Sequence, residues 1–146
     1  KVPKVLGADG VQKMSKSLNN HIELASTPEE TRQRVMTMVT DPQRARRTDP
    51  GRPEVCNVFS MHKIFSSAEE VKMVETECRN AGIGCVDCKK LFAKNLNENL
   101  APFRERRAGF EAHPDDVFDV LKDGATRASD LAEKTMVEVR AAIGLI

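Results

Sequence analysis

Five consecutive residues, Lys13-Met14-Ser15-Lys16-Ser17, have the composition of a phosphate-binding loop. The two lysine ammonium groups can converge on one polyphosphate, while the serine hydroxyls and backbone N–H groups add further donors. When pyrophosphate leaves ATP, negative charge grows on the leaving oxygens, so lysines that tighten on that charge accelerate the step. The alternative interpretation is a solvated surface loop.

Four cysteines, Cys56, Cys78, Cys85 and Cys88, follow with the spacing C-x21-C-x6-C-x2-C. Three interpretations are open: unrelated buried thiols, a structural zinc site with four thiolates, or the ligands of a [4Fe–4S] cluster. Zinc sites more often pair two short C-x2-C hooks, and this chain has one. A cubane cluster is wider than a zinc ion and tolerates looser spacing.

Basic residues gather in a Pro-rich segment, residues 41–53, and again near residue 90, where they suit contacts to RNA phosphates. The candidates for tRNA binding are Arg44, Arg46, Arg47, Arg52, Lys89 and Lys90. Solvated helix faces and a solvated loop are the alternative. The formal net charge of +1 does not itself require a nucleic-acid partner, and without Trp or Tyr the chain offers few stacking platforms for bases.

The elements that must position these groups are helical after residue 26. Thr27–Glu30 and Ser67–Glu70 are capping boxes that predict helix starts. The first helix should run to about Thr40 and the helix after Ser67 should end near Gly82. Between them, helical spacing of Val55, Val58, Phe59, His62 and Phe65 predicts a further helix.

A long helix should follow Gly84, with Pro102 kinking it or marking a break. Its predicted apolar stripe is Cys88, Leu91, Phe92, Leu96, Leu100, Phe103 and Phe110. Two more helices are expected, one opening at His113 and one spanning about residues 125–143. Their predicted core positions are Val117, Val120, Leu121, Ala128, Leu131, Ala132, Val139 and Ile143. The sequence therefore predicts an all-α antiparallel bundle over residues 26–146, preceded by a strand end and a mobile loop.

Residues around the loop resemble the class I aminoacyl-tRNA synthetases. Gly7-Ala8-Asp9-Gly10 precedes the loop and Leu18-Asn19-Asn20 follows it. The helical remainder resembles the tryptophanyl branch of that family. The matching segments are Val39-Thr40-Asp41, Val55-Cys56-Asn57-Val58-Phe59, Asn99-Leu100-Ala101-Pro102-Phe103-Arg104-Glu105-Arg106 and Val120-Leu121-Lys122-Asp123-Gly124-Ala125. The tyrosyl branch shares the loop but usually continues into a further RNA-binding module.

This resemblance implies a C-terminal fragment of a tryptophan–tRNA ligase. The parent would activate L-tryptophan with ATP and Mg²⁺ to tryptophanyl-adenylate and transfer it to tRNA(Trp), as a cytoplasmic homodimer. Residues 1–25 would end a Rossmann-type catalytic domain, and residues 26–146 would form the anticodon-binding domain. Residues 13–17 would bind ATP, with Lys16 the main catalytic lysine and Lys13 supporting it.

Some members of the branch bind a [4Fe–4S] cluster through four cysteines of nearly this spacing, the first gap being one residue longer. The resemblance therefore favours a structural cluster on Cys56, Cys78, Cys85 and Cys88 over zinc.

A different class of function stays open: a non-catalytic all-α RNA-binding module with a structural zinc or iron–sulfur site. The family's second signature, of the His-x-Gly-His type, is absent, and His21, His62 and His113 are interpreted as packing or capping residues. The fragment alone is therefore expected to be inactive. No apolar run approaches the roughly 20 residues that cross a membrane.

Overall fold

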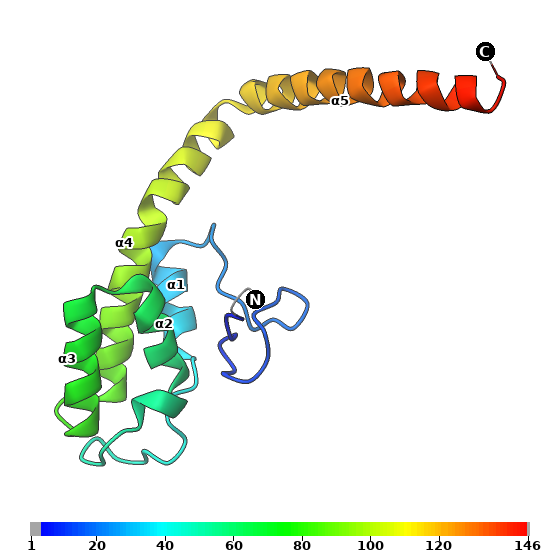
Figure 1. Cartoon of the computed structure of the whole chain (residues 1–146). Helices are drawn as coiled ribbons and strands as arrows, with labels where there is room; N and C mark the ends of the chain where they lie inside the picture. Colours follow the sequence, from blue (N-terminus) through cyan, green and yellow to red (C-terminus); the bar gives the residue numbers. More distant parts are fainter. Residues whose placement is uncertain (1–3, 146) are drawn as a thin grey trace. The chain divides into compact units, whose positions relative to one another are not determined.

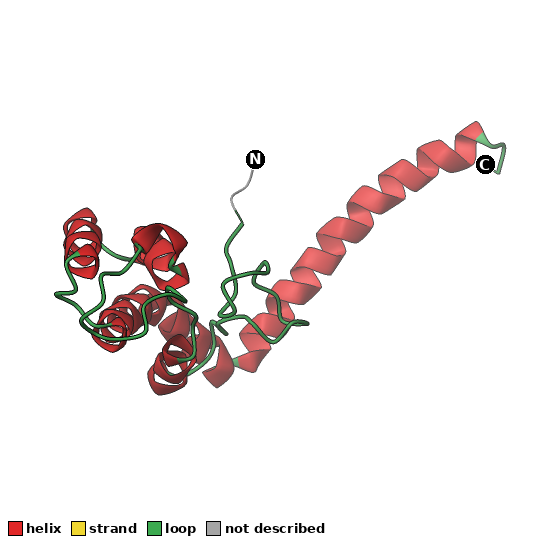
Figure 2. Cartoon of the chain, turned by 90° about the horizontal axis from the view of Figure 1, so that it is seen from below, coloured by secondary structure: helices red, strands yellow, loops and turns green. Residues whose placement is uncertain are grey.

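The computed structural model describes residues 4–145, and Figure 1 shows their helices in chain order. They are α1 (Pro28–Met36), a 3-10 turn η1 (Pro53–Val55), α2 (Asn57–Phe65), α3 (Ala68–Arg79), α4 (Cys85–Ala112) and α5 (Pro114–Ala142). Among the described residues the β pairing is a single isolated bridge between Leu6 and Lys13, and Figure 2 shows helices and loops only. The all-α prediction is confirmed.

The chain separates into two compact units, Lys1–Arg104 and Glu105–Ile146. The first unit contains all four cysteines and residues 13–17, the predicted phosphate-binding loop, which is called the phosphate loop below. The boundary predicted between residues 25 and 26 separates two domains of a longer parent protein. It is therefore not tested by this division and stays a prediction.

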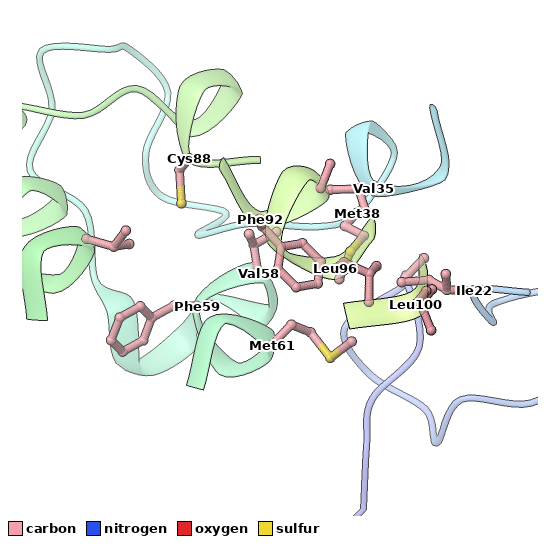
Figure 3. Packing of buried hydrophobic residues seen from close by; sticks show 13 residues of the cluster. Ile22, Val35, Met38, Val58, Phe59, Met61, Cys88, Phe92, Leu96 and Leu100 are labelled. Atoms are coloured by element: carbon pink, nitrogen blue, oxygen red, sulfur yellow. The ribbon is translucent and has the colours of Figure 1, made fainter. Parts of the chain in front are cut away.

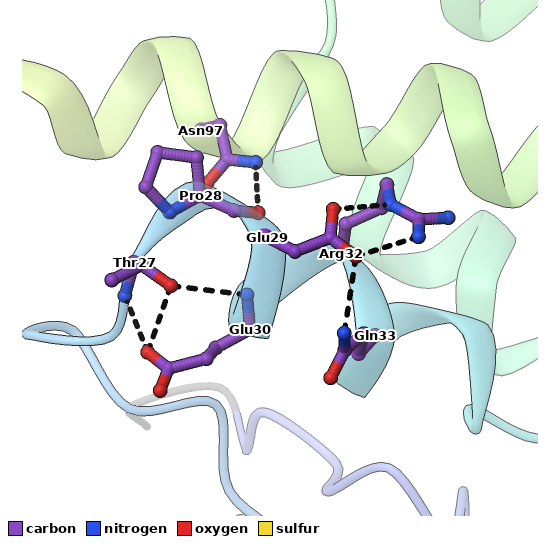
Figure 4. A network of polar contacts seen from close by, with 7 residues as sticks. All are labelled: Thr27, Pro28, Glu29, Glu30, Arg32, Gln33 and Asn97. Atoms are coloured by element: carbon purple, nitrogen blue, oxygen red, sulfur yellow. Dashed lines mark hydrogen bonds and ion pairs between the residues drawn. The ribbon is translucent and has the colours of Figure 1, made fainter.

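Both predicted capping boxes are present. Figure 4 shows the first, in which the Thr27 hydroxyl accepts from the Glu30 N–H at 3.2 Å and the Glu30 carboxylate accepts from the Thr27 N–H at 2.8 Å. Ser67 and Glu70 repeat the arrangement at the start of α3. Each box satisfies two N–H groups that a helix start leaves without partners, and such a cap stabilises by about 1 kcal/mol.

The core of the first unit forms where α4 packs against the shorter helices. Figure 3 shows Phe92 beside Val58 and Leu96, and its side chain is fully buried. His62 is equally buried, and its ring meets that of Phe92 edge-on with centroids 5.3 Å apart. The predicted stripe of α4 is buried at Cys88, Phe92, Leu96 and Leu100.

Helix α1 is shorter than predicted, because it ends at Met36 and not at about Thr40. The Thr37 hydroxyl donates to the Arg34 carbonyl at 2.8 Å, and the Lys89 ammonium donates to the Met36 carbonyl at 2.9 Å. These donors satisfy carbonyl groups that another helical turn would have used. Val39 then leaves the helix, and its N–H donates to the Ala8 carbonyl at 3.0 Å.

Helix α4 runs through Pro102 without a break. Of the two outcomes predicted at Pro102, a kink or a break, the break does not occur, since one proline removes one backbone hydrogen bond from a helix of 28 residues that is packed along its first half.

The second unit departs further from the prediction. The two helices expected after His113 are one continuous helix, α5, of 29 residues, and none of its side chains is buried. Its predicted core positions are therefore wrong as a buried face within the described residues; Leu131, for example, is 69% exposed. A glycine inside a helix costs only about 1 kcal/mol, so Gly124 did not separate the two segments.

Candidate phosphate loop and cysteine site

The phosphate loop is a small hairpin-like turn at the surface of the first unit. The Met14 N–H donates to the Val5 carbonyl and the Gly7 N–H to the Gln12 carbonyl, both at 2.9 Å. Lys13 and Lys16 are exposed, while Met14 packs against the core. Residues 16–19 form a turn closed by the Asn19 N–H and the Lys16 carbonyl at 3.0 Å. Both lysine side chains are therefore available to a phosphate chain in solution.

A buried amide, Asn20, holds the loop from inside. Its Oδ1 accepts from the Ser15 N–H at 2.8 Å, and its Nδ2 donates to Asp9 Oδ2 at 2.7 Å. Asp9 in turn accepts from the N–H groups of Val11 and Gln12. These hydrogen bonds lower the pKa of Asp9, the Val11 N–H contributing most and Asn20 next. The sequence analysis placed neither residue in the site, although short polar residues flanking a Gly-rich turn are its usual fasteners.

The base of the loop docks on the helical part of the same unit. The Gly7 carbonyl accepts from Asn57 Nδ2 at 2.7 Å, and this hydrogen bond is buried. Gly10 has a φ of 69°, and a Cβ there would lie 3.3 Å from the Asn57 Cβ. The loop expected to be a mobile appendage is therefore fastened at its base to the first residue of α2.

The four cysteines converge on the region where the segment after α1 meets α2, α3 and α4. Cys56 is the N-cap of α2, Cys78 lies in the last turn of α3, and Cys85 and Cys88 lie in the first turn of α4. All four are free thiols. The Cys78 sulfur lies against the Cα of Gly51, so no larger residue than glycine fits there.

One guanidinium joins two of these thiols. Arg44 Nη1 lies 3.7 Å from the Cys78 sulfur and 3.9 Å from the Cys85 sulfur. Arg44 Nη2 donates to the carbonyls of Arg47 and Ile83 at 2.9 and 2.8 Å. The sequence analysis considered Arg44 only as an RNA contact, because its distance from the cysteines along the chain gives no sign of this role.

Burial and mutual proximity govern the ionisation of the thiols. Burial first, and the neighbouring Cys56, Cys78 and Cys85 next, together raise the pKa of Cys88 to about 12. Burial also raises the pKa of Cys56 and of Cys78, against which the Arg44 charge lowers that of Cys78. The four thiols thus share one neighbourhood, in which Cys78 and Cys85 lie on either side of the Arg44 Nη1 atom.

This neighbourhood is not a closed single-ion site. Among residues 4–145, no three His, Cys, Asp or Glu side chains are arranged so that they could hold one metal ion. A tetrahedral zinc site with Zn–S bonds of about 2.3 Å requires its sulfurs roughly 3.8 Å apart. The arrangement therefore offers four thiols with the Arg44 guanidinium beside two of them.

Three of the six basic residues proposed for RNA binding are engaged within the protein. Arg44 is held as described, and Lys89 closes α1. Arg52 forms a two-pronged pair with Asp41, at 2.6 Å from Nη2 to Oδ1 and 3.1 Å from Nε to Oδ2. Asp41 is 6% exposed, and the Arg52 guanidinium holds the pKa of that carboxyl well below its usual range.

Arg46, Arg47 and Lys90 are the more accessible members of the set. Arg46 and Arg47 are exposed, and the Lys90 ammonium lies 3.8 Å from Asp87 at the surface. Residues 44–47 and 84–87, with Thr40, line a pocket of about 260 Å³ that includes Cys85.

Two of the three histidines can be compared with their predicted packing or capping roles. His62 contacts the Ser66 hydroxyl at 2.7 Å and the Cys88 carbonyl at 3.3 Å, and its burial lowers its pKa. It is a packing residue, as predicted. His113 takes the N-cap position of α5 but its side chain makes no capping hydrogen bond.

A sequence profile of the family described as class I tRNA synthetases (W and Y) matches residues 2–101. A tryptophan–tRNA ligase of Aquifex aeolicus is 46% identical over 144 residues, covering 98% of this chain and 36% of that protein. One of Thermotoga maritima is 47% identical over 147 residues, covering 100% of this chain and 44% of that protein. The chain thus spans about two fifths of the length of these relatives.

Solved structures agree with the sequence relatives. The tryptophanyl-tRNA synthetase of Campylobacter jejuni, in complex with ADP and tryptophan, superposes with a TM-score of 0.88 at 28% identity, over 99% of this chain and 44% of that one. The tryptophanyl-tRNA synthetase of the archaeon Aeropyrum pernix gives a TM-score of 0.62 at 33% identity, over 70% of this chain and 29% of that one.

Proposed function

This chain belongs to the class I tRNA synthetases of the tryptophan and tyrosine branch, and we propose that it supplies the ATP-phosphate loop and the tRNA-binding helical part of a tryptophan–tRNA ligase. The observation that carries the proposal is a pair of exposed lysines, Lys13 and Lys16, on a loop fastened from inside by Asn20. The relatives that match nearly all of this chain, at 46 and 47% identity, are both tryptophan–tRNA ligases. The full-length protein would act as a cytoplasmic homodimer.

In the proposed reaction, the carboxylate of L-tryptophan attacks the α-phosphorus of ATP. An O–P bond forms to give tryptophanyl-adenylate, and the bond to the leaving oxygen breaks to release pyrophosphate. Negative charge then builds up on pyrophosphate, where the two lysine ammonium groups stabilise it, with Mg²⁺ as the companion of the substrate. Lys16 acts as the main catalytic residue and Lys13 as its support. The tryptophan pocket lies outside this chain.

The test is the full reading frame that contains this chain, assayed for amino-acid-dependent exchange of pyrophosphate into ATP and for charging of tRNA. L-tryptophan should support both reactions. Exchange with tyrosine in its place would move the chain to the other branch of the family. A full-length protein with no exchange, yet with tRNA binding, would establish the non-catalytic RNA-binding module instead.

Contact with the tRNA anticodon arm is assigned to the exposed basic residues Arg46, Arg47 and Lys90, beside the pocket that contains Cys85. Arg44, Arg52 and Lys89 support that surface from within, because their charges already have partners in the protein. The exposed residues are assigned to the tRNA because a phosphate contact requires a cationic side chain that can extend into solvent.

The gathered thiols of Cys56, Cys78, Cys85 and Cys88 are proposed to hold a [4Fe–4S] cluster with a structural role. Three features support it: the position of the four thiols at the junction of α2, α3 and α4, the glycine at residue 51, where a side chain would collide with the Cys78 sulfur, and the Arg44 guanidinium that offsets negative charge. The choice of a cluster over a single zinc ion follows from the family resemblance of the cysteine spacing. When bound, the cluster would cross-link α2, α3 and α4 and carry out no redox step in the reaction.

Metal content decides this second proposal. Protein purified without air should be brown, with iron and sulfide in equal amounts and with visible absorption that Cys88→Ser abolishes. Zinc without iron in the same preparation would replace the cluster by a structural zinc site. Neither metal bound, at any pH where the thiols ionise, would return the cysteines to a role in core packing.

A further inference from the structure

The connection between the phosphate loop and α2 goes beyond the residues that bind ATP. Asn57 is the first residue of α2 and directly follows Cys56. Its Nδ2 donates to the carbonyl of Gly7, 50 positions earlier in the chain, at 2.7 Å. Asn57 is 5% exposed, so this hydrogen bond is shielded from water. A buried donor of this kind costs free energy when its acceptor is lost.

Gly7 also packs against Asn20, the residue that holds the loop from inside. Its Cα lies against the Asn20 side chain so closely that any side chain at position 7 would collide with it. Asn20 then accepts from the Ser15 N–H, in the middle of the loop, at 2.8 Å. The neighbouring residue Ala8 adds two backbone contacts, to the Asn20 carbonyl at 2.7 Å and from the Val39 N–H at 3.0 Å. The path from Asn57 to Ser15 is therefore continuous, buried at Asn57, Gly7 and Asn20 and part-buried at Ser15.

We infer that Asn57 is a positioning residue for the phosphate loop: by holding Gly7, it fixes the loop base to α2, so that Lys13 and Lys16 take their place relative to the helices. The structural role of Asn57 is independent of the proposed function, and only its expected effect on catalysis rests on that function. Asn57 touches no substrate and acts through Gly7 and Asn20. A one-ångström displacement of a group that binds the transition state can cost a hundredfold in rate.

Asn95 provides a matched control. It is a second buried asparagine of the same unit, at 6% exposure, and its Nδ2 donates to Ser66 at 2.9 Å and to Glu70 at 2.7 Å. Truncating either asparagine removes a buried amide, but Asn95 lies on α4 and contacts no part of the loop. A difference between Asn57→Ala and Asn95→Ala therefore reports loop positioning and not general loss of stability.

Hydrogen exchange of the Ser15 amide, measured by NMR in this chain, is the direct test. Asn57→Ala should accelerate exchange at Ser15 about tenfold more than it accelerates exchange of the core amides of α4, whereas Asn95→Ala should change the two in proportion. Should Asn57→Ala fail to fold, Asn57→Ser, which keeps a shorter donor, is expected to give a smaller change of the same sign. Equal acceleration at Ser15 in the Asn57 and Asn95 variants would overturn the inference.

The full-length ligase gives the second readout. Asn57→Ala should lower the kcat of pyrophosphate exchange about tenfold and leave the KM for tryptophan unchanged, while Asn95→Ala leaves both unchanged. If the unmodified full-length protein shows no exchange, the proposed function fails, yet the Ser15 measurement still decides the positioning role. If the exchange is present and the two variants reduce kcat alike, the positioning role fails and the proposed function stands.

Discussion

The phosphate loop and the cysteine site lie in the same unit but differ in which part of the charged residues is held in place. In the loop, the backbone is fastened by Asn20 and Asn57 while the lysine side chains are exposed. In the cysteine site the charged side chain itself is fastened, since Arg44 is shared between two sulfurs and two carbonyls.

The phosphate loop is therefore suited to charge that develops during a reaction, and the cysteine site is suited to charge that is permanently present. Exposed lysines on a fixed backbone can tighten on charge that appears only in a transition state. A guanidinium whose two Nη groups are both engaged cannot move toward a substrate, but it can offset charge on buried thiolates or on a cluster that they hold. Substitutions in the loop should therefore change rate without stability, and substitutions around the cysteines should change stability first.

The largest effect is expected from Lys16→Ala in the full-length ligase. If this ammonium contributes about 3 kcal/mol to the transition state, the rate of pyrophosphate exchange falls by roughly a hundredfold or more. The free energy of unfolding should stay within about 0.5 kcal/mol, as for other surface substitutions. Lys72→Ala, on the exposed face of α3, is the control that should alter neither quantity. Unchanged exchange in Lys16→Ala would remove the lysine from catalysis.

Asp41→Ala should give the largest loss of stability near the cysteines. It leaves Arg52 without its two-pronged partner, and the free energy of unfolding at pH 7 should fall by about 2 kcal/mol. Urea unfolding measures it, with the exposed residue Asp130 of α5, changed to Ala, as the control.

The same pair predicts a pH dependence. Because folding lowers the pKa of Asp41, the unfolded chain takes up this proton first, and the stabilisation is complete above the unfolded pKa of about 3.9. It is lost as the pH falls from there through the folded pKa. The difference between the unmodified chain and Asp41→Ala should thus be constant from pH 5 to 8 and shrink below pH 4. A difference that grows on acidification would contradict the assignment.

Arg44→Met tests whether the guanidinium beside the thiols is structural. It removes two hydrogen bonds to carbonyls and should destabilise the metal-free chain by about 1 to 2 kcal/mol. Arg44→Lys should recover little, because an ammonium cannot reproduce the planar fork. Arg47→Met is the neighbouring control and should be nearly neutral in the same unfolding measurement. Equal stabilities of the Arg44 and Arg47 variants would place Arg44 with the solvated charges.

The smallest effects are expected from the exposed arginines. Arg46→Ala and Arg47→Ala should each weaken tRNA binding severalfold and reduce the slope of log affinity against log salt by about 0.7 to 1. Arg52→Ala should leave that slope unchanged and act only through stability. Binding isotherms at several salt concentrations distinguish the two patterns. A slope change in Arg52→Ala alone would exchange their roles.

Local signals predicted the helix starts well, and they predicted a loop at residues 13–17, whose binding of phosphate stays a prediction. Thr27 and Ser67 begin helices because each capping box is complete within four residues, and the phosphate loop was visible as five adjacent residues. Helix ends were less predictable. Helix α1 ends at Met36 partly because Lys89 closes it, a contact across 53 positions that no local pattern reveals.

The same distinction explains the sites. The four cysteines were recognisable by residue type, but the position of Arg44 between two of them depends on how α3, α4 and the preceding segment pack. Asn57 carried no sequence signal of its role, since its acceptor is a backbone carbonyl. In α5, helical spacing of apolar residues predicted a buried face, although periodicity shows only that such residues share one side of a helix.

The long reach of the Asn57–Gly7 hydrogen bond also has a consequence for the order of events during synthesis on the ribosome. Gly7, at the base of the loop, is translated 50 residues before the side chain that fastens it. At 5 to 20 residues per second, this leaves the loop without its anchor for roughly 3 to 10 seconds. The capping boxes of α1 and α3 need no such wait, because their partners are three residues apart. The loop is thus held in place only once Asn57 has been made, although it precedes α2 in the chain.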